Sequence, residues 1–162
     1  MDHDYYPDAL LRRILREVRT IAMVGASPDW NRPSYFAMKY LQIKGYRVIP
    51  VNPKSAGDTI LDEPVYASLR EIPDRVDMVD IFRASAAVPP IVEDAIAIGA
   101  KVVWMQIGVR NDAAARRAED AGLTVIMNRC PKIEYGRLNR ELSWGGVNSR
   151  IISSKRRLEV GR

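Results

Sequence analysis

An amide and an ammonium group follow an apolar run in the first third of the chain. The stretch VIPVNPKSAG, residues 48–57, ends its apolar part at Val51 and continues with Asn52, Pro53 and Lys54. In many nucleotide-binding sheets a carboxylate at this point binds the ribose hydroxyls of the ligand. Lys54 would instead attract a phosphate on that ribose, Asn52 would bind a hydroxyl or a base edge, and Pro53 would fix the turn.

A phosphate on the ribose limits the ligands that this turn would suit. Two ligands with a phosphorylated ribose fit: a 2′-phosphorylated nicotinamide cofactor, and coenzyme A with its 3′-phospho-ADP. A lysine just past a strand is also commonly a solvated loop residue, and this reading is the alternative for Lys54. Composition does not choose between the two ligands.

A second group of phosphate-binding candidates lies in GASPDWNRPSYF, residues 25–36. The dinucleotide fingerprint has three glycines, whereas this turn has only Gly25 and is longer and stiffened by two prolines. Free amides at the start of the following helix can still hold a phosphate, and Ser27, Arg32 and Ser34 add donors. The alternative is that Ser34 caps the helix and Arg32 is solvated. This turn is therefore not typical of NAD-binding proteins.

Few residues are candidates for covalent or acid–base chemistry. Cys130 in NRCPKIEY is the one cysteine, and His3, in the N-terminal tail, is the one histidine, so no imidazole base is expected near the thiol. A small buried apolar role is the alternative for Cys130. Glu134 is the best acid–base candidate, whereas Asp77 and Asp80 flank a predicted strand with the wrong period for one strand face. No metal-ligand spacing is present, so we expect no metal site.

Apolar runs and helical periodicities alternate along the chain and would position these residues. PDALLRRILREVR, residues 7–19, predicts an N-terminal amphipathic helix. The segment 64–72 is predicted as a short helix or irregular structure. Strands are predicted at 20–27, 46–51, 76–82, 101–108 and 123–127, and helices at 33–45, 88–99 and 111–122, the last with Asn111 as its cap.

This alternation predicts an α/β fold: a doubly wound, mainly parallel, Rossmann-like sheet with helices on both faces, preceded by the N-terminal helix. Parallel strands bring the segments that follow them to one carboxyl edge, where such sheets bind ligands. The segments expected at that edge are 25–34, 52–55, 82–85, 106–110 and 128–131.

The length and composition of the chain limit its number of domains, its partners and its location. The 162 residues suit one domain, 1–162, with an N-terminal helical part, 1–19, and a mobile basic tail, 153–162. A net charge of +5 favours anionic partners, either a nucleic acid or a phosphorylated small molecule, and no nucleic-acid-binding module accompanies the tail. No apolar run is long enough to span a membrane, and a single cysteine favours the cytosol.

The joint pattern RPSYF, VIPVNPK and NRCPKIEY resembles the small stand-alone CoA-binding proteins. These are related to the CoA-binding domain of the succinyl-CoA synthetase alpha subunit and of the NDP-forming acyl-CoA synthetases. The resemblance runs from about Ile21 to Tyr135, and it departs from the synthetases where the Pro-rich first turn replaces a loop bearing glycine and glutamine.

The resemblance implies a role for thirteen residues along one CoA molecule. Residues of the first turn would hold its phosphates, those of the second turn its 3′-phosphate, and those after the two following strands its adenine and its pantetheine. In that order they are Gly25, Ala26, Ser27, Arg32 and Ser34; Asn52, Pro53 and Lys54; Phe82 and Arg83; Met105, Gln106 and Ile107.

The function that follows is a binding module for CoA or an acyl-CoA that catalyses nothing itself. The related synthetases pass phosphate through a histidine in a second domain, and a chain of this length with one histidine has neither. The competing hypotheses are an NADP-dependent oxidoreductase with the same phosphate-binding edge, and an interaction protein whose fold has lost its ligand. A homo-oligomer and an association with a larger CoA enzyme are further candidate partnerships.

Overall fold

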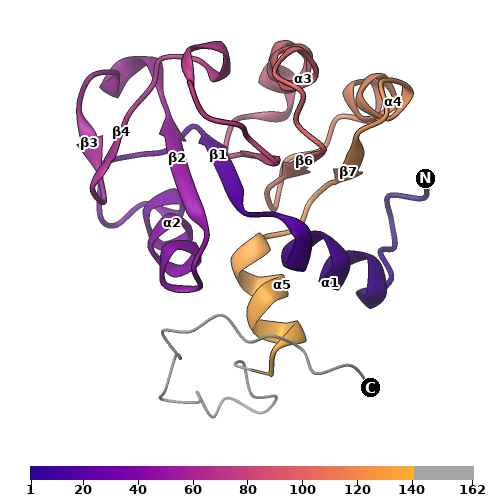
Figure 1. Cartoon of the computed structure of the whole chain (residues 1–162). Helices are drawn as coiled ribbons and strands as arrows, with labels where there is room; N and C mark the ends of the chain where they lie inside the picture. Colours follow the sequence, from indigo (N-terminus) through magenta and orange to yellow (C-terminus); the bar gives the residue numbers. More distant parts are fainter. Residues whose placement is uncertain (141–162) are drawn as a thin grey trace.

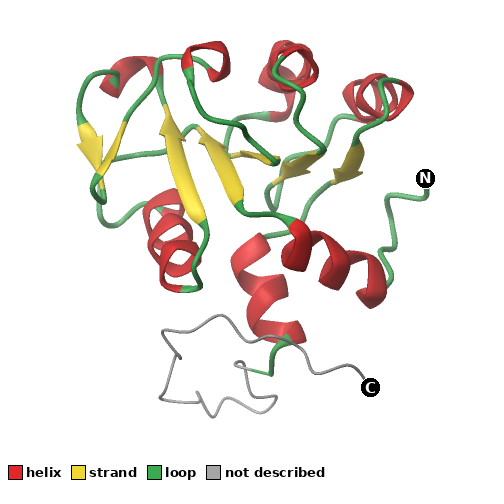
Figure 2. Ribbon diagram, viewed as in Figure 1, coloured by secondary structure: helices red, strands yellow, loops and turns green. Residues whose placement is uncertain are grey.

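The computed structural model describes residues 1–140, and they form an α/β domain built on a parallel sheet (Figures 1 and 2). The predicted basic tail, 153–162, lies outside the described residues. In chain order the elements are α1 (Asp8–Glu17), β1 (Thr20–Val24), α2 (Pro33–Ile43), β2 (Arg47–Val51), β3 (Thr59–Ile60), β4 (Glu63–Pro64), β5 (Met78–Ile81), α3 (Val88–Ala97), β6 (Val102–Met105), α4 (Asp112–Asp120), β7 (Thr124–Ile126) and α5 (Pro131–Leu138), with 3-10 turns η1 (Pro53–Ser55), η2 (Leu69–Glu71) and η3 (Ser85–Ala87).

The sheet has the strand order β2-β1-β5-β6-β7, and all neighbouring strands are parallel. The chain steps from β1 outward to β2 and then crosses to the opposite side of β1 to form β5. This reversal creates a crevice at the carboxyl ends of β1 and β5, the place where open α/β sheets bind ligands. The register pairs Val24 with both Val51 and Ile81, so these three strands end at one level.

Helices cover both faces of the sheet, as the alternation predicts. Figure 1 shows α1, α2 and α5 on one face and α3 and α4 on the other. The first face buries a cluster around Leu11, Met38 and Trp104, and the second buries one around Val79 and Val103. The central strands are apolar on both sides because neither face meets water.

The N-terminal segment is held against the sheet, whereas the sequence suggested a tail. The Tyr6 hydroxyl accepts the backbone N–H of Met127 at 2.8 Å and lies 2.7 Å from His3 Nδ1. His3 Nε2 lies 2.8 Å from a Glu119 carboxylate oxygen on α4. The single imidazole is therefore used to fasten this segment. No helix among residues 1–140 is long and apolar enough to cross a membrane.

Two parts of the fold differ from the prediction. The segment 64–72 is neither one helix nor wholly irregular, because it contains the end of the β3–β4 hairpin and the turn η2. The hairpin turns through Leu61 and Asp62, both at positive φ, where Asn-Gly is the usual signal. The helix α5 was not predicted: it begins at a proline and contains Gly136, so its local propensity is weak. Burial of Tyr135 and Leu138 stabilises it instead.

Candidate functional site

A glycine allows the first turn to pass close to the end of β5. Gly25 has a φ of +88°, and its N–H donates to the carbonyl of Val51 at 2.9 Å. A Cβ on Gly25 would lie 2.5 Å from the carbonyl oxygen of Phe82, closer than any real contact. Only glycine fits here, and the approach brings the segments that follow β1, β2 and β5 together.

Two polar side chains of the first and second turns bind the protein's own backbone. The Asn52 amide donates to the carbonyl of Ala26 at 2.8 Å, and its Oδ1 accepts the N–H of Lys54 at 3.0 Å. The buried Ser34 hydroxyl accepts the N–H of Ser27 at 3.0 Å. Ser34 is not the cap of α2, because the helix begins one residue earlier and has Arg32 in the cap position. Both side chains therefore shape the turns.

The cations at this edge are exposed. Arg32 lies 4.0 Å from Asp29, a weak pair between two largely solvated side chains. Lys54 lies in η1, and Arg83 follows β5; within residues 1–140 neither forms an ion pair. These positive charges are available to an anionic ligand.

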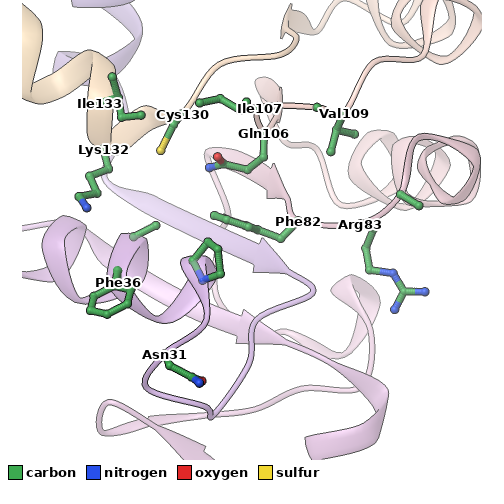
Figure 3. Close-up of a pocket in the computed structure, with 14 residues that line it drawn as sticks. Asn31, Phe36, Phe82, Arg83, Gln106, Ile107, Val109, Cys130, Lys132 and Ile133 are labelled. Carbon is green, nitrogen blue, oxygen red and sulfur yellow. The ribbon is translucent and has the colours of Figure 1, made fainter.

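A large pocket opens between the ends of β5 and β6 (Figure 3). It has a volume of about 740 Å³, which is within the range that holds a whole small molecule. We call it the β5–β6 pocket. It is lined by residues from the first turn and α2, from the segments after β5 and β6, and from the start of α5, namely Asn31, Pro33, Phe36, Ala37, Phe82, Arg83, Ala84, Gln106, Ile107, Gly108, Val109, Cys130, Lys132 and Ile133.

A smaller pocket lies on the other side of Arg83. Its volume is about 260 Å³, and we call it the β1–β2 pocket. It is lined by the ends of β1 and β2, the segment before η2 and the start of α3, namely Val24, Gly25, Val51, Pro53, Ala67, Ser68, Leu69, Arg83, Ala87, Pro90, Ile91 and Asp94. Since Arg83 lines both pockets, one extended ligand could occupy the two together.

A buried carboxyl group lies behind the β5–β6 pocket. Asp80 is fully buried within β5, not at its edge, and accepts hydrogen bonds from the Gln106 amide at 3.1 and 3.3 Å. Burial raises the pKa of Asp80 from 3.8 to about 8, although the Gln106 bond opposes the shift. The carboxyl is therefore largely protonated at neutral pH, which explains how a central strand contains it.

The two candidates for chemistry are placed differently. Cys130 lines the β5–β6 pocket at the start of α5, and burial raises the pKa of its thiol despite hydrogen bonds from the backbone N–H groups of Ile133 and Lys132. Glu134 is buried and accepts bonds from Arg137 at 2.7 and 3.0 Å, and Arg137 also binds Asp8 of α1. Arg137 therefore connects α5 to α1, and Glu134 holds its guanidinium within α5. Within residues 1–140 no cluster of side chains could hold a metal ion.

The thirteen residues expected to bind a ligand meet at one edge with unequal access. Phe82, Gln106 and Ile107 line the β5–β6 pocket, Gly25 and Pro53 line the β1–β2 pocket, and Arg83 lines both. Met105 is fully buried in β6 and lines neither. The others surround the first two turns without lining these pockets: Ala26, Ser27, Arg32, Ser34, Asn52 and Lys54. Phe36, Lys132 and Ile133 were not among the expected site residues, although they lie in the motifs RPSYF and NRCPKIEY, because those motifs do not show which of their side chains face the pocket.

Comparisons with known proteins identify the family of the chain. Residues 19–136 match a family model described as the CoA binding domain. The uncharacterized protein YneT of Bacillus subtilis is 36% identical over 127 residues, which cover 78% of this chain and 93% of that protein. A hypothetical protein of known structure from Pyrococcus horikoshii is 42% identical, with a TM-score of 0.79, over 84% of this chain and 94% of that one. The ADP-forming acetate–CoA ligase I of Archaeoglobus fulgidus is 28% identical over 152 residues, which cover 86% of this chain but 21% of the ligase.

Proposed function

The chain belongs to the CoA binding domain family, and from this premise we propose that it binds coenzyme A or an acyl-CoA along the carboxyl edge of its sheet and catalyses no reaction itself. The observation that carries the proposal is the pair of pockets that share Arg83 and flank the close approach of Gly25 to Phe82. A molecule with a nucleotide at one end and a long arm at the other suits two pockets joined in this way.

The adenosine end would occupy the β1–β2 pocket. Pro53 lines this pocket, and Lys54 follows it in η1 without an ion-pair partner among residues 1–140. An ammonium group beside an adenosine would favour its 3′-phosphate. Asn52 acts here by holding the first and second turns together through Ala26, so its contribution to binding is to position the backbone.

The pyrophosphate would lie against the first turn and the start of α2. The helix begins at Pro33, so the positive end of its dipole faces the turn, while the N–H groups of Tyr35 and Phe36 donate to the carbonyl of Arg32. Arg32, at the cap position, adds a cation whose pairing with Asp29 is weak enough to be replaced. Gly25 keeps the turn close to β5, where a side chain would push it away.

The pantetheine arm would extend into the β5–β6 pocket, along Phe82, Gln106 and Ile107. The groups that could do chemistry there are poorly suited to it. The Cys130 thiol is held in its neutral form by burial, and Asp80 is fully buried behind the pocket. The lining contains no histidine. This chain covers 21% of the acetate–CoA ligase that it resembles, so the ligase activity is not proposed for this chain.

Calorimetry on the full chain tests the proposal. We expect CoA to bind more tightly than NADP or NAD, and we expect no product from ATP or GTP, CoA and a carboxylic acid. Tighter binding of NADP than of CoA would overturn the assigned ligand in favour of the oxidoreductase hypothesis. Product formation by the chain alone would contradict the proposal that it catalyses no reaction.

A further inference from the structure

Exposed large apolar side chains converge on the β5–β6 pocket. Among residues 1–140 the exposed large hydrophobic residues are Met1, Tyr5, Trp30, Phe36, Ile43, Ile107 and Ile133. Three of these, Phe36, Ile107 and Ile133, line this one pocket, although they come from α2, the segment after β6 and α5 (Figure 3). Exposed apolar residues that are scattered singly need no explanation, whereas their convergence on one pocket marks a binding site.

The charges around this pocket are of one sign and lie at its sides. No carboxylate is among the residues that line it, and Asp80 lies behind Gln106 with its carboxyl protonated at neutral pH. The cations of the lining are Arg83, which also borders the β1–β2 pocket, and Lys132, whose ammonium lies 6.0 Å from the centre of the Tyr40 ring. The large apolar side chains of the lining are Phe82, Val109 and the three exposed residues, and its uncharged polar side chains are Asn31 and Gln106.

A pantetheine arm alone would leave this apolar surface partly unused. The arm carries two amides and ends in a small thiol, so Phe36 and Ile133, on the α2 and α5 walls of the pocket, would remain exposed beyond it. An apolar group attached to the thiol would cover them and would gain free energy from removing that surface from water.

We infer that the ligand this pocket is built for is an acyl-CoA with an uncharged hydrocarbon acyl group, seated against Phe36, Ile107 and Ile133. The inference rests on the proposed CoA binding and adds the class of acyl group. Acyl groups with a terminal carboxylate should bind less well, because Phe36, Ile107 and Ile133 would remove the carboxylate from water without a hydrogen bond, and Lys132 is the cation that would have to offset this cost.

A ligand series measured by calorimetry on the full chain tests the inference. The series contains CoA, acetyl-CoA, butanoyl-CoA, hexanoyl-CoA, succinyl-CoA and hexanoate alone. We expect the affinity to rise two- to fourfold for each methylene from acetyl to hexanoyl, since a fully buried methylene gives about fourfold. Succinyl-CoA should bind more weakly than butanoyl-CoA, and hexanoate alone should not bind where hexanoyl-CoA saturates.

Three isoleucine variants test whether side chains of this pocket cause the rise in affinity with acyl length. Ile107→Ser and Ile133→Ser should both flatten the rise with chain length. Ile133→Ser should leave the affinity for CoA within about twofold, whereas Ile107→Ser, beside the proposed pantetheine arm, should lower that affinity as well. Ile43→Ser is the matched control, because Ile43 is 39% exposed, close to the 42% of Ile133, and does not line the pocket. All three positions are exposed, so thermal melts of the variants should stay near the wild type.

Each result bears on one claim. A wild type that binds CoA with an affinity independent of acyl length overturns the inference and leaves the proposed function standing, whereas no binding of CoA or of any acyl-CoA overturns the proposed function itself. Succinyl-CoA that binds more tightly than butanoyl-CoA would assign the pocket to anionic acyl groups next to Lys132. Hexanoate that binds as tightly as hexanoyl-CoA would assign it to free fatty acids. Equal effects in the Ile43→Ser control would also contradict the inference.

Discussion

The two sides of the carboxyl edge use their side chains in different ways. On the β1–β2 side, the Asn52 and Ser34 side chains bind backbone groups of the first and second turns, and the cations Arg32 and Lys54 are exposed. On the β5–β6 side, apolar side chains form the walls, and the buried Gln106–Asp80 pair lies at the back. Under the proposed function, the β1–β2 side would recognise the charge of the ligand, and the β5–β6 side would cover its apolar part.

The largest expected effect is that of replacing Gly25, because the backbone conformation of the β1–β2 side depends on this residue. Gly25→Ala should lower the free energy of unfolding by roughly 2–4 kcal/mol, because it combines a positive φ with a clash against a backbone carbonyl. CoA affinity should fall at least tenfold. Gly57→Ala is the matched control: its φ is +90°, but nothing lies within 4 Å of the added Cβ, so only about 1 kcal/mol should be lost. Urea unfolding and calorimetry measure both, and an unchanged CoA affinity in folded Gly25→Ala would contradict the account.

The second prediction concerns Asp80, the buried carboxyl group on the β5–β6 side. The folded-state pKa of Asp80, about 8, lies above its ordinary value of 3.8, so the folded state holds the proton more tightly. The contribution of Asp80 to stability is therefore complete below about pH 4 and is lost as the pH rises from 4 to 8. Asp80→Asn, which can still accept the Gln106 bond, should raise the free energy of unfolding by about 1–3 kcal/mol at pH 8, with little gain at pH 4.

Asp77 provides the control for this pH dependence. It lies just before β5 and accepts the backbone N–H groups of Arg19 and Thr20, both at 3.0 Å, so its carboxylate has partners that an amide would bind less well. Asp77→Asn should lose stability at pH 8, whereas Asp80→Asn should gain it. Equal responses in denaturant titrations at pH 4, 6 and 8 would show that burial does not set the behaviour of Asp80.

A smaller effect is expected for the first of the two cations. Arg32→Ala should weaken CoA and dephospho-CoA alike, by about 1 kcal/mol, because both molecules keep the pyrophosphate that Arg32 would meet and the arginine is exposed. Arg116→Ala is a suitable control, since Arg116 is an exposed arginine on α4 and lines neither pocket. A loss confined to CoA would move Arg32 to the 3′-phosphate.

The sequence predicted the sheet well because its strands are buried on both faces. Such strands read as apolar runs, and the helices between them carry local signals such as Asn111, whose Oδ1 accepts the N–H of Ala114 at 2.9 Å, confirming the predicted cap. The helix α5 carries no comparable signal, since its stability comes from contacts with α1 and α2, which lie far away in sequence.

The site was harder to predict for the same reason. Asp80 reads as a residue at the edge of a strand, and its place inside β5 depends on Gln106, 26 residues further along the chain. Asn52 reads as a ligand-binding amide, and whether it faces a ligand or Ala26 depends on how closely the first turn approaches. Residue types and local spacing thus predicted which segments lie at the carboxyl edge, but long-range pairing decides which side chains remain available there.

Calorimetry of CoA and dephospho-CoA, with the wild type and Lys54→Ala, tests the central claim most directly. The two ligands differ only in the 3′-phosphate, so wild type should prefer CoA by about 1 kcal/mol, roughly fivefold, given that Lys54 is exposed. Lys54→Ala should lose this preference while its affinity for dephospho-CoA stays unchanged, and Lys101→Ala, which removes an exposed lysine before β6 at the opposite edge of the sheet, should keep it. Equal affinities of the wild type for CoA and dephospho-CoA would contradict the assignment of the second turn to the 3′-phosphate.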